Sequence, residues 1–149
     1  MPVIRTTITV AAPAERAWAV LGDLEAVDTW IPGVNNCRLE GRRRICNEGE
    51  IEEEIVAYTP EDRSYRYRHV KVPLPVRRSS GRLAVVDTPD GTAIDWEADV
   101  EWSDLSSAAE MTAMLEGVYR QVLESLRRRI EEAETGSQAE TMPSRAQSK

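Results

Sequence analysis

The sequence feature that most constrains the fold is a long stretch of helical periodicity near the C-terminus, between Ser106 and Glu132. At about 100° per residue, its apolar positions cover roughly half of the helix circumference, which is wider than the stripe of an ordinary surface helix. A helix so long and so broadly apolar is expected to lie across a concave sheet, and a sheet curved around a helix tends to enclose a cavity. The apolar positions are Ala108, Met111, Met114, Leu115, Val118, Tyr119, Val122, Leu123, Leu126 and Ile130.

Most of the remaining chain predicts short antiparallel strands, which makes the fold class α+β. Two short helices are predicted over 14–21 and 24–30, and two prolines make 72–75 a loop. Residues 1–132 are expected to form one domain, followed by a disordered tail over 133–149, because the tail is polar and has few apolar residues. Alternation of apolar and polar residues predicts strands over 3–10, 35–40, 49–58, 63–70, 82–87 and 92–102.

The net charge of the chain limits which classes of partner it is expected to bind. Its 149 residues include 26 acidic and 19 basic side chains, which gives a net charge of −7. An acidic chain repels phosphate backbones and anionic lipid surfaces, so we expect neither nucleic acid nor a membrane as a partner. Whether the protein is a monomer or a homodimer stays open.

The N-terminus and the lack of a long apolar run predict a cytoplasmic protein. Nothing at the start of the chain resembles a signal peptide, and no apolar run has the length of a membrane span. Cys37 and Cys46 are therefore expected to be reduced thiols, with a cross-strand disulfide as the alternative.

Four segments resemble the polyketide cyclase/dehydrase branch of the START-like (Bet v 1-like, SRPBCC) superfamily. They are the opening helix at 13–23, the Trp-Ile-Pro-Gly-Val run at 30–34, the Leu-Pro-Val run at 74–76, and Met-Leu-Glu-Gly-Val-Tyr at 114–119. The resemblance extends over about Val3 to Ile130. It implies a helix-grip fold, in which a curved seven-stranded antiparallel sheet surrounds the long C-terminal helix over an internal cavity. It also implies that 1–132 is a START-like ligand-binding domain, although the superfamily holds lipid carriers, hormone receptors and aromatase/cyclases alike.

The common motifs of cofactor and metal chemistry are absent. The chain has no glycine-rich phosphate loop, no GxSxG elbow, no HExxH and no CxxC. With a single histidine and two cysteines, we expect no metal site and no cofactor. In the acidic run at 50–54, strand alternation points Glu52 and Glu54 outward, so a solvated face is favoured over a cation site. The arginines at 42–44 are interpreted as solvated in a turn.

One polar group of residues is predicted inside the cavity. If Arg66 and Arg68 face solvent, alternation points Tyr65, Tyr67 and His69 inward. A short loop near Pro60 then places Glu53 opposite His69 or one pair away, next to Tyr67. A carboxylate and an imidazole in an apolar cavity would shift each other's pKa and could move protons, so Glu53, His69 and Tyr67 are catalytic candidates. The alternative is that Glu53 and His69 satisfy each other without catalysis.

Three functions stay open, and binding of a hydrophobic small molecule is favoured. The protein would then carry or sequester a polyketide-, lipid- or aromatic-metabolite-like ligand. The second is a cyclase, dehydratase or aromatase that uses Glu53 and His69 as acid/base groups. The third is an accessory protein whose cavity has collapsed. The residues predicted to contact a ligand are Trp30, Cys37, Tyr65, Tyr67, His69, Trp96, Met114, Val118 and Tyr119.

Overall fold

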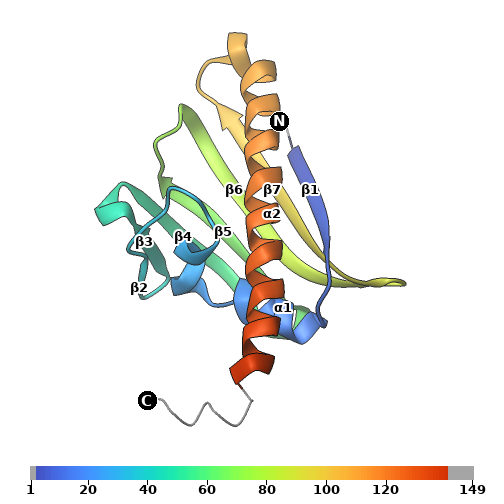
Figure 1. Cartoon of the computed structure of the whole chain (residues 1–149). Coiled ribbons are helices and arrows are strands. Elements are labelled where there is room, and N and C mark those ends of the chain that lie inside the picture. The colour runs from blue at the N-terminus through green and yellow to red at the C-terminus, as the bar shows by residue number, and fades with distance from the viewer. Residues whose placement is uncertain (1–2, 141–149) are drawn as a thin grey trace.

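The structure, a computed structural model, describes residues 3–140, and the side chains of residues 3–132. One curved antiparallel sheet contains seven strands in the order β1-β7-β6-β5-β4-β3-β2. The long helix α2 lies across one face of this sheet, with the short helix α1 near its C-terminal half (Figure 1). The elements are β1 (Val3–Val10), α1 (Ala14–Leu21), η1 (Leu24–Thr29), β2 (Arg38–Glu40), β3 (Arg43–Cys46), η2 (Asn47–Gly49), β4 (Ile51–Thr59), η3 (Pro60–Asp62), β5 (Ser64–Lys71), β6 (Val76–Thr88), β7 (Gly91–Trp102), η4 (Leu105–Ser107) and α2 (Ala108–Glu140).

The predicted helix-grip fold is confirmed. Helix α1 has the predicted bounds, the second short helix is the 3-10 helix η1, and 72–75 is a loop. The backbone of α2 continues as a helix beyond the predicted end at Glu132, as far as Glu140. The rest of the predicted tail, 141–149, lies outside the described residues. Within the part of the chain that the structure describes, no helix is long and apolar enough to cross a membrane.

The arginines at 42–44 correct the prediction of a solvated turn. Arg43 and Arg44 begin strand β3, and because successive strand residues face opposite sides, only Arg43 points to solvent. Arg43 pairs with Glu52 at 2.9 Å, whereas Arg44 is 3% exposed. Arg42 donates hydrogen bonds to two backbone carbonyl groups on β4. One of the three consecutive arginines, Arg44, is therefore a buried cation.

The expectation of reduced thiols is also wrong for this structure, which joins Cys37 and Cys46 in a disulfide. Arg38 pairs with Ile45 in the β2–β3 ladder, so the two cysteines are the next facing positions, with Cα atoms 4.2 Å apart. Reduced thiols were expected because the sequence predicts a cytoplasmic protein. That prediction gives no information on how close the two cysteine side chains lie in the fold.

The helix α2 buries most of the face that its periodicity predicts. Leu123, Leu126 and Ile130 are at most 1% exposed and pack against the concave face of the sheet. At the edge of this face, Met114 and Val118 remain 56% and 43% exposed. The apolar stripe that contacts the sheet is thus narrower than the apolar stripe of the sequence.

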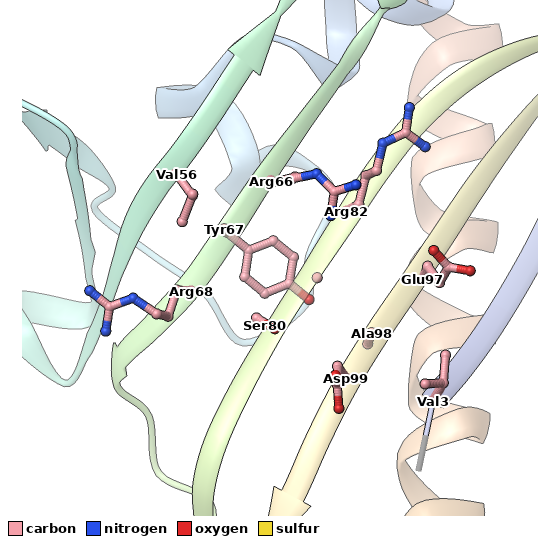
Figure 2. Close-up of a pocket in the computed structure, with 11 residues that line it drawn as sticks. Val3, Val56, Arg66, Tyr67, Arg68, Ser80, Arg82, Glu97, Ala98 and Asp99 are labelled. Atoms are coloured by element: carbon pink, nitrogen blue, oxygen red, sulfur yellow. The ribbon is translucent and has the colours of Figure 1, made fainter. Parts of the chain in front are cut away.

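A glycine in β6 makes room for one large aromatic ring. Tyr67 on β5 and Ala98 on β7 flank Gly81 in the ladder, and the Tyr67 ring reaches from β5 across β6 (Figure 2). A Cβ atom at Gly81 would lie 2.4 Å from the Tyr67 hydroxyl oxygen. Such a contact forces either the ring or the strand to move.

We therefore predict opposite effects for two glycine substitutions. Gly81→Ala should lower the free energy of unfolding by about 1–3 kcal/mol, because the added methyl group overpacks the core. Gly117→Ala on α2 meets no atom within 4 Å and should raise it by about 0.5–1 kcal/mol through helix propensity. Urea unfolding followed by circular dichroism measures both, and equal effects of the two variants would contradict the packing described.

Candidate ligand-binding site

A cavity of about 140 Å³ lies between α2 and the concave face of the sheet. Its wall is mainly aromatic and aliphatic, with a few polar groups, which is the usual composition of a small-molecule site. The lining residues are Trp30, Ile31, Arg44, Glu53, Tyr65, Tyr67, His69, Leu74, Leu83, Trp96, Leu115, Val118, Tyr119 and Val122.

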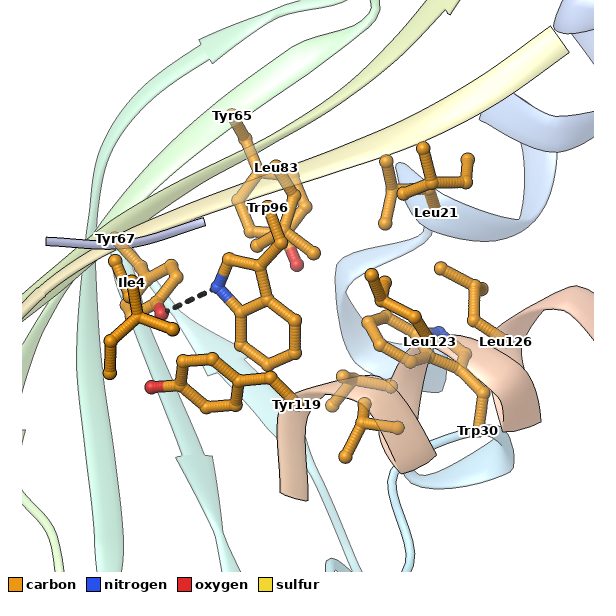
Figure 3. Packing of buried hydrophobic residues seen from close by; sticks show 14 of the residues in the cluster. Ile4, Leu21, Trp30, Tyr65, Tyr67, Leu83, Trp96, Tyr119, Leu123 and Leu126 are labelled. Atoms are coloured by element: carbon orange, nitrogen blue, oxygen red, sulfur yellow. Dashed lines mark hydrogen bonds between the residues drawn. The ribbon is translucent and has the colours of Figure 1, made fainter. Parts of the chain in front are cut away.

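Three aromatic side chains form one wall of the cavity. The rings of Trp96 on β7 and Tyr119 on α2 stack with centroids 3.9 Å apart and planes inclined by 21°. The Trp96 indole N–H donates a hydrogen bond to the Tyr67 hydroxyl at 3.0 Å (Figure 3). Burial raises the pKa of Tyr119 to about 12 and raises the pKa of Tyr67 well above its usual value. Both phenols are therefore neutral at physiological pH.

A buried ion pair forms the polar side of the cavity. Arg44 Nε on β3 donates to Glu53 Oε1 on β4 at 2.7 Å. The same guanidinium donates through Nη1 to the carbonyl of Leu24 at 3.2 Å and lies 5.4 Å from the centre of the Tyr65 ring. The cation is thus held by a carboxylate, a backbone carbonyl and an aromatic face.

The carboxylate of the ion pair also contacts His69, which in turn contacts Ser79. His69 Nε2 lies 3.1 Å from Glu53 Oε2, and His69 Nδ1 lies 2.8 Å from the hydroxyl of Ser79. Since an ionised carboxylate only accepts hydrogen bonds, Nε2 carries the proton that Glu53 accepts. In the neutral imidazole Nδ1 then accepts from Ser79, so both ring nitrogens are occupied.

The charges of this network are fixed by mutual contact. Burial by itself would raise the pKa of Glu53, but the Arg44 charge and the hydrogen bonds from His69 and Arg44 lower it to about 2. Burial opposes the charge of Arg44, yet Tyr65 and Glu53 raise its pKa above the ordinary value. Glu53 is therefore an anion and Arg44 a cation across the physiological range, and their charges cancel.

The predicted register of the central hairpin is confirmed. Glu53 on β4 lies directly opposite His69 on β5, and the Tyr67 ring is next to the imidazole, with centroids 5.3 Å apart. The residues predicted to contact a ligand that do line the cavity are Trp30, Tyr65, Tyr67, His69, Trp96, Val118 and Tyr119.

Two predicted ligand contacts lie elsewhere. Met114 is 56% exposed on α2 and is not among the lining residues, because it sits one helical position outside the buried stripe. Cys37 is bonded to Cys46 and also does not line the cavity. Sequence reasoning missed Arg44, although recognition of β3 would have placed it opposite Glu53 in the β3–β4 ladder.

Comparison with known proteins places the chain in a family. Residues 1–131 match the family model described as polyketide cyclase / dehydrase and lipid transport. Since the match extends over most of the chain, the protein belongs to this family. No curated protein matches the sequence.

Solved structures show the same fold at low identity. XoxI from Bacillus cereus is 20% identical with a TM-score of 0.79, over 90% of this chain and 99% of that chain. A START superfamily protein from Mycobacterium smegmatis is 18% identical with a TM-score of 0.73, over 88% and 98% of the two chains. The di-domain ARO/CYC StfQ from the steffimycin biosynthetic pathway is 14% identical with a TM-score of 0.70, over 89% of this chain and 51% of that chain. At these identities the likeness concerns the fold alone.

The Arg44–Glu53 pair predicts a specific dependence of stability on pH. Because the pKa of Glu53 is lowered in the folded state, its contribution is present above its ordinary pKa of 4.5 and is lost as the pH falls toward about 2. Relative to Glu53→Gln, the wild type should therefore lose about 3 kcal/mol of unfolding free energy between pH 5 and pH 2.

Urea unfolding at several pH values measures this difference. Glu40→Gln is the matched control, because Glu40 pairs with Arg38 on the surface, where both side chains are more than half exposed. Exposed pairs contribute at most about 1 kcal/mol, so this control should differ little from the wild type at any pH. A free-energy difference between wild type and Glu53→Gln that does not change with pH would show that Glu53 is not held as an anion.

Proposed function

We propose that this protein binds a small, neutral, apolar molecule of about the size of one aromatic ring in the cavity beneath α2. The observation that carries the proposal is a cavity of about 140 Å³ whose wall is dominated by aromatic and aliphatic side chains. An apolar cavity of about 150 Å³ in another protein binds benzene. The space that the packed core leaves here is thus sufficient for one ring.

The cavity volume supports a small ligand over a long one. Sites for drug-sized molecules enclose about 300–1,000 Å³, so a polyketide or acyl chain would require α2 or its surroundings to move. The same volume argues against a fully collapsed interior, because the aromatic side chains do not fill the space. Binding of a single ring needs no rearrangement of the wall.

The charges of the wall favour a neutral ligand. Arg44 is the buried cation of the cavity, and it is already engaged by Glu53 and by the carbonyl of Leu24. A ligand carboxylate would have to displace Glu53, which would leave a buried anion without its partner at a cost of about 3–5 kcal/mol. We therefore expect benzoate to bind far more weakly than toluene.

The route into the cavity lies where its wall meets solvent. Val118 on α2 is 43% exposed although it lines the cavity, and Leu74 in the 72–75 loop and Ile31 after η1 are half-buried. A ligand would enter between these three side chains. Motion of the loop, which contains two prolines and is tied to the end of β7 by a backbone hydrogen bond from Ser103 to Pro75, would widen this route.

Binding has more support than acid/base catalysis. A carboxylate with a pKa of about 2 is a weak base, and both nitrogens of His69 are occupied. The order of contacts is that of a hydrolytic triad, with Ser79 as the nucleophile, His69 as the base and Glu53 as the carboxylate that orients it. A ligand in the cavity would not reach this nucleophile, because Ser79 is 3% exposed and does not line the cavity. A polyketide cyclase-like reaction would need these contacts to rearrange.

The proposal predicts that filling the cavity abolishes binding. Val122→Phe adds a ring inside the wall and should weaken toluene binding at least about tenfold, since the ligand and the new side chain compete for the same space. Met114→Phe adds the same ring on the exposed side of α2 and should leave the affinity within about twofold. Isothermal titration calorimetry with toluene measures both, after circular dichroism shows that the variants fold.

Two further ligands, naphthalene and benzoate, test the size and the charge of the site. Naphthalene should bind more weakly than toluene because the cavity does not hold two fused rings, and benzoate should not bind measurably. Equal affinities of the wild type and Val122→Phe for toluene would contradict binding in this cavity, and tighter binding of benzoate would contradict a neutral ligand.

A further inference from the structure

One polar atom of a residue in the cavity wall has no partner in the protein. Trp30 follows η1, is 2% exposed and lines the cavity beneath α2. Its indole Nε1 is inaccessible to solvent and has no hydrogen-bond partner among the described residues. A buried N–H group that loses water without gaining an acceptor is destabilising, and native structures rarely contain one. Such a donor beside a cavity indicates a position where an acceptor from outside the protein can bind.

The other buried tryptophans show what the Trp30 position lacks. Trp96 and Trp102 are at most 6% exposed, and each donates its indole N–H to a hydroxyl oxygen. The acceptor for Trp96 is Tyr67 at 3.0 Å, and the acceptor for Trp102 is Thr112 at 2.9 Å. Within the part of the chain that the structure describes, Trp30 is thus the buried tryptophan whose donor the fold leaves unpaired.

Apolar packing holds the Trp30 ring in place. The ring belongs to the same buried cluster as Leu21 on α1 and as Leu123 and Leu126 on α2, whose side chains offer no acceptor (Figure 3). The backbone N–H of Trp30 donates to the carbonyl of Val27 at 3.1 Å, which fixes the end of η1. Because the ring and the backbone are both held, the indole donor has a defined position before a ligand binds.

The carboxylate of the cavity wall is not available to this donor. Glu53 accepts from Arg44 Nε at 2.7 Å and lies 3.1 Å from His69 Nε2. A water molecule is a poor acceptor here, because a buried water makes about three hydrogen bonds and Trp30 offers it one. A ligand whose ring fills the apolar space can present an oxygen to the same donor without that loss.

We propose that the ligand carries one neutral acceptor oxygen next to its aromatic ring, as an aromatic aldehyde does, and that Trp30 Nε1 donates a hydrogen bond to this oxygen. The inference rests on the proposed function and adds one polar atom to the ligand described there. The acceptor is neutral because Arg44 is engaged by Glu53 and supplies no free cation for a carboxylate. Trp30 is then the residue that distinguishes an oxygen-bearing ring from a hydrocarbon of the same shape.

Benzaldehyde and styrene test this hydrogen bond, because the two molecules have the same shape and differ by an oxygen atom in place of a CH₂ group. Their hydration also differs, so the quantity to compare between protein variants is the ratio of the two affinities. Trp30→Phe keeps an aromatic ring and removes the donor, and it should lower the affinity for benzaldehyde relative to styrene about fivefold or more. Isothermal titration calorimetry measures both ligands, after circular dichroism shows that each variant is folded.

Trp102→Phe is the matched control. It removes an indole donor that is already bonded to Thr112 and that belongs to a residue outside the cavity lining. The ratio of the two affinities should therefore stay within about twofold of the wild-type ratio.

A second measurement uses the wild type alone and does not depend on the folding of Trp30→Phe. In proton–nitrogen correlation spectra, benzaldehyde should move the Trp30 indole proton downfield of its position with styrene, since a hydrogen bond to oxygen deshields the proton. The Trp102 indole signal should be the same with both ligands, because Thr112 accepts that N–H throughout.

The inference is overturned if Trp30→Phe leaves the affinity ratio unchanged, or if the Trp30 indole signal of the wild type is the same with benzaldehyde and styrene. In either case, binding of styrene and toluene to the wild type would still support the proposed function. If the wild type binds none of the three molecules, the proposed function fails and this inference fails with it.

Discussion

The packing of α2 against the concave sheet is the constraint on which the rest of the structure depends. The helix buries a continuous apolar face, and the rings of Trp96 on β7 and Tyr119 on α2 stack between the sheet and the helix. Tyr67 enters the same space because Gly81 offers no side chain on the adjacent strand. These three aromatic rings line the cavity and limit its volume to about 140 Å³.

A second constraint is the buried ion pair at the other side of the cavity. Arg44, Glu53 and His69 come from three consecutive strands, and the carbonyl of Leu24 ties the pair to η1. A buried pair of this kind contributes little net stability, but loss of either partner would leave a charge without compensation. The network therefore fixes the geometry of the wall, and the charges of Arg44 and Glu53 cancel, which is the electrostatic basis for a neutral ligand.

Sequence periodicity predicts the parts of this structure that depend on local pattern. The apolar stripe of α2, the alternation in β7 and the pairing of Glu53 with His69 across the central hairpin all follow from spacing along the chain. The burial of Arg44 does not, because three consecutive arginines give no signal for which one faces a carboxylate. Cavity volume depends on how distant segments pack, and a single sequence does not encode it in its pattern. The Cys37–Cys46 bond instead depends on the local β2–β3 register, which was not predicted because β3 was not recognised as a strand.

We propose that a single ring occupies the space beside Trp96 and Tyr119. Diffraction from crystals soaked with iodobenzene tests it most directly, because the anomalous signal of iodine locates the ligand without assumptions about its pose. We expect one strong anomalous peak inside the cavity, in contact with the Trp96–Tyr119 wall, and no peak there in crystals of Val122→Phe. An empty cavity in crystals whose only iodine sites lie on the surface would contradict it.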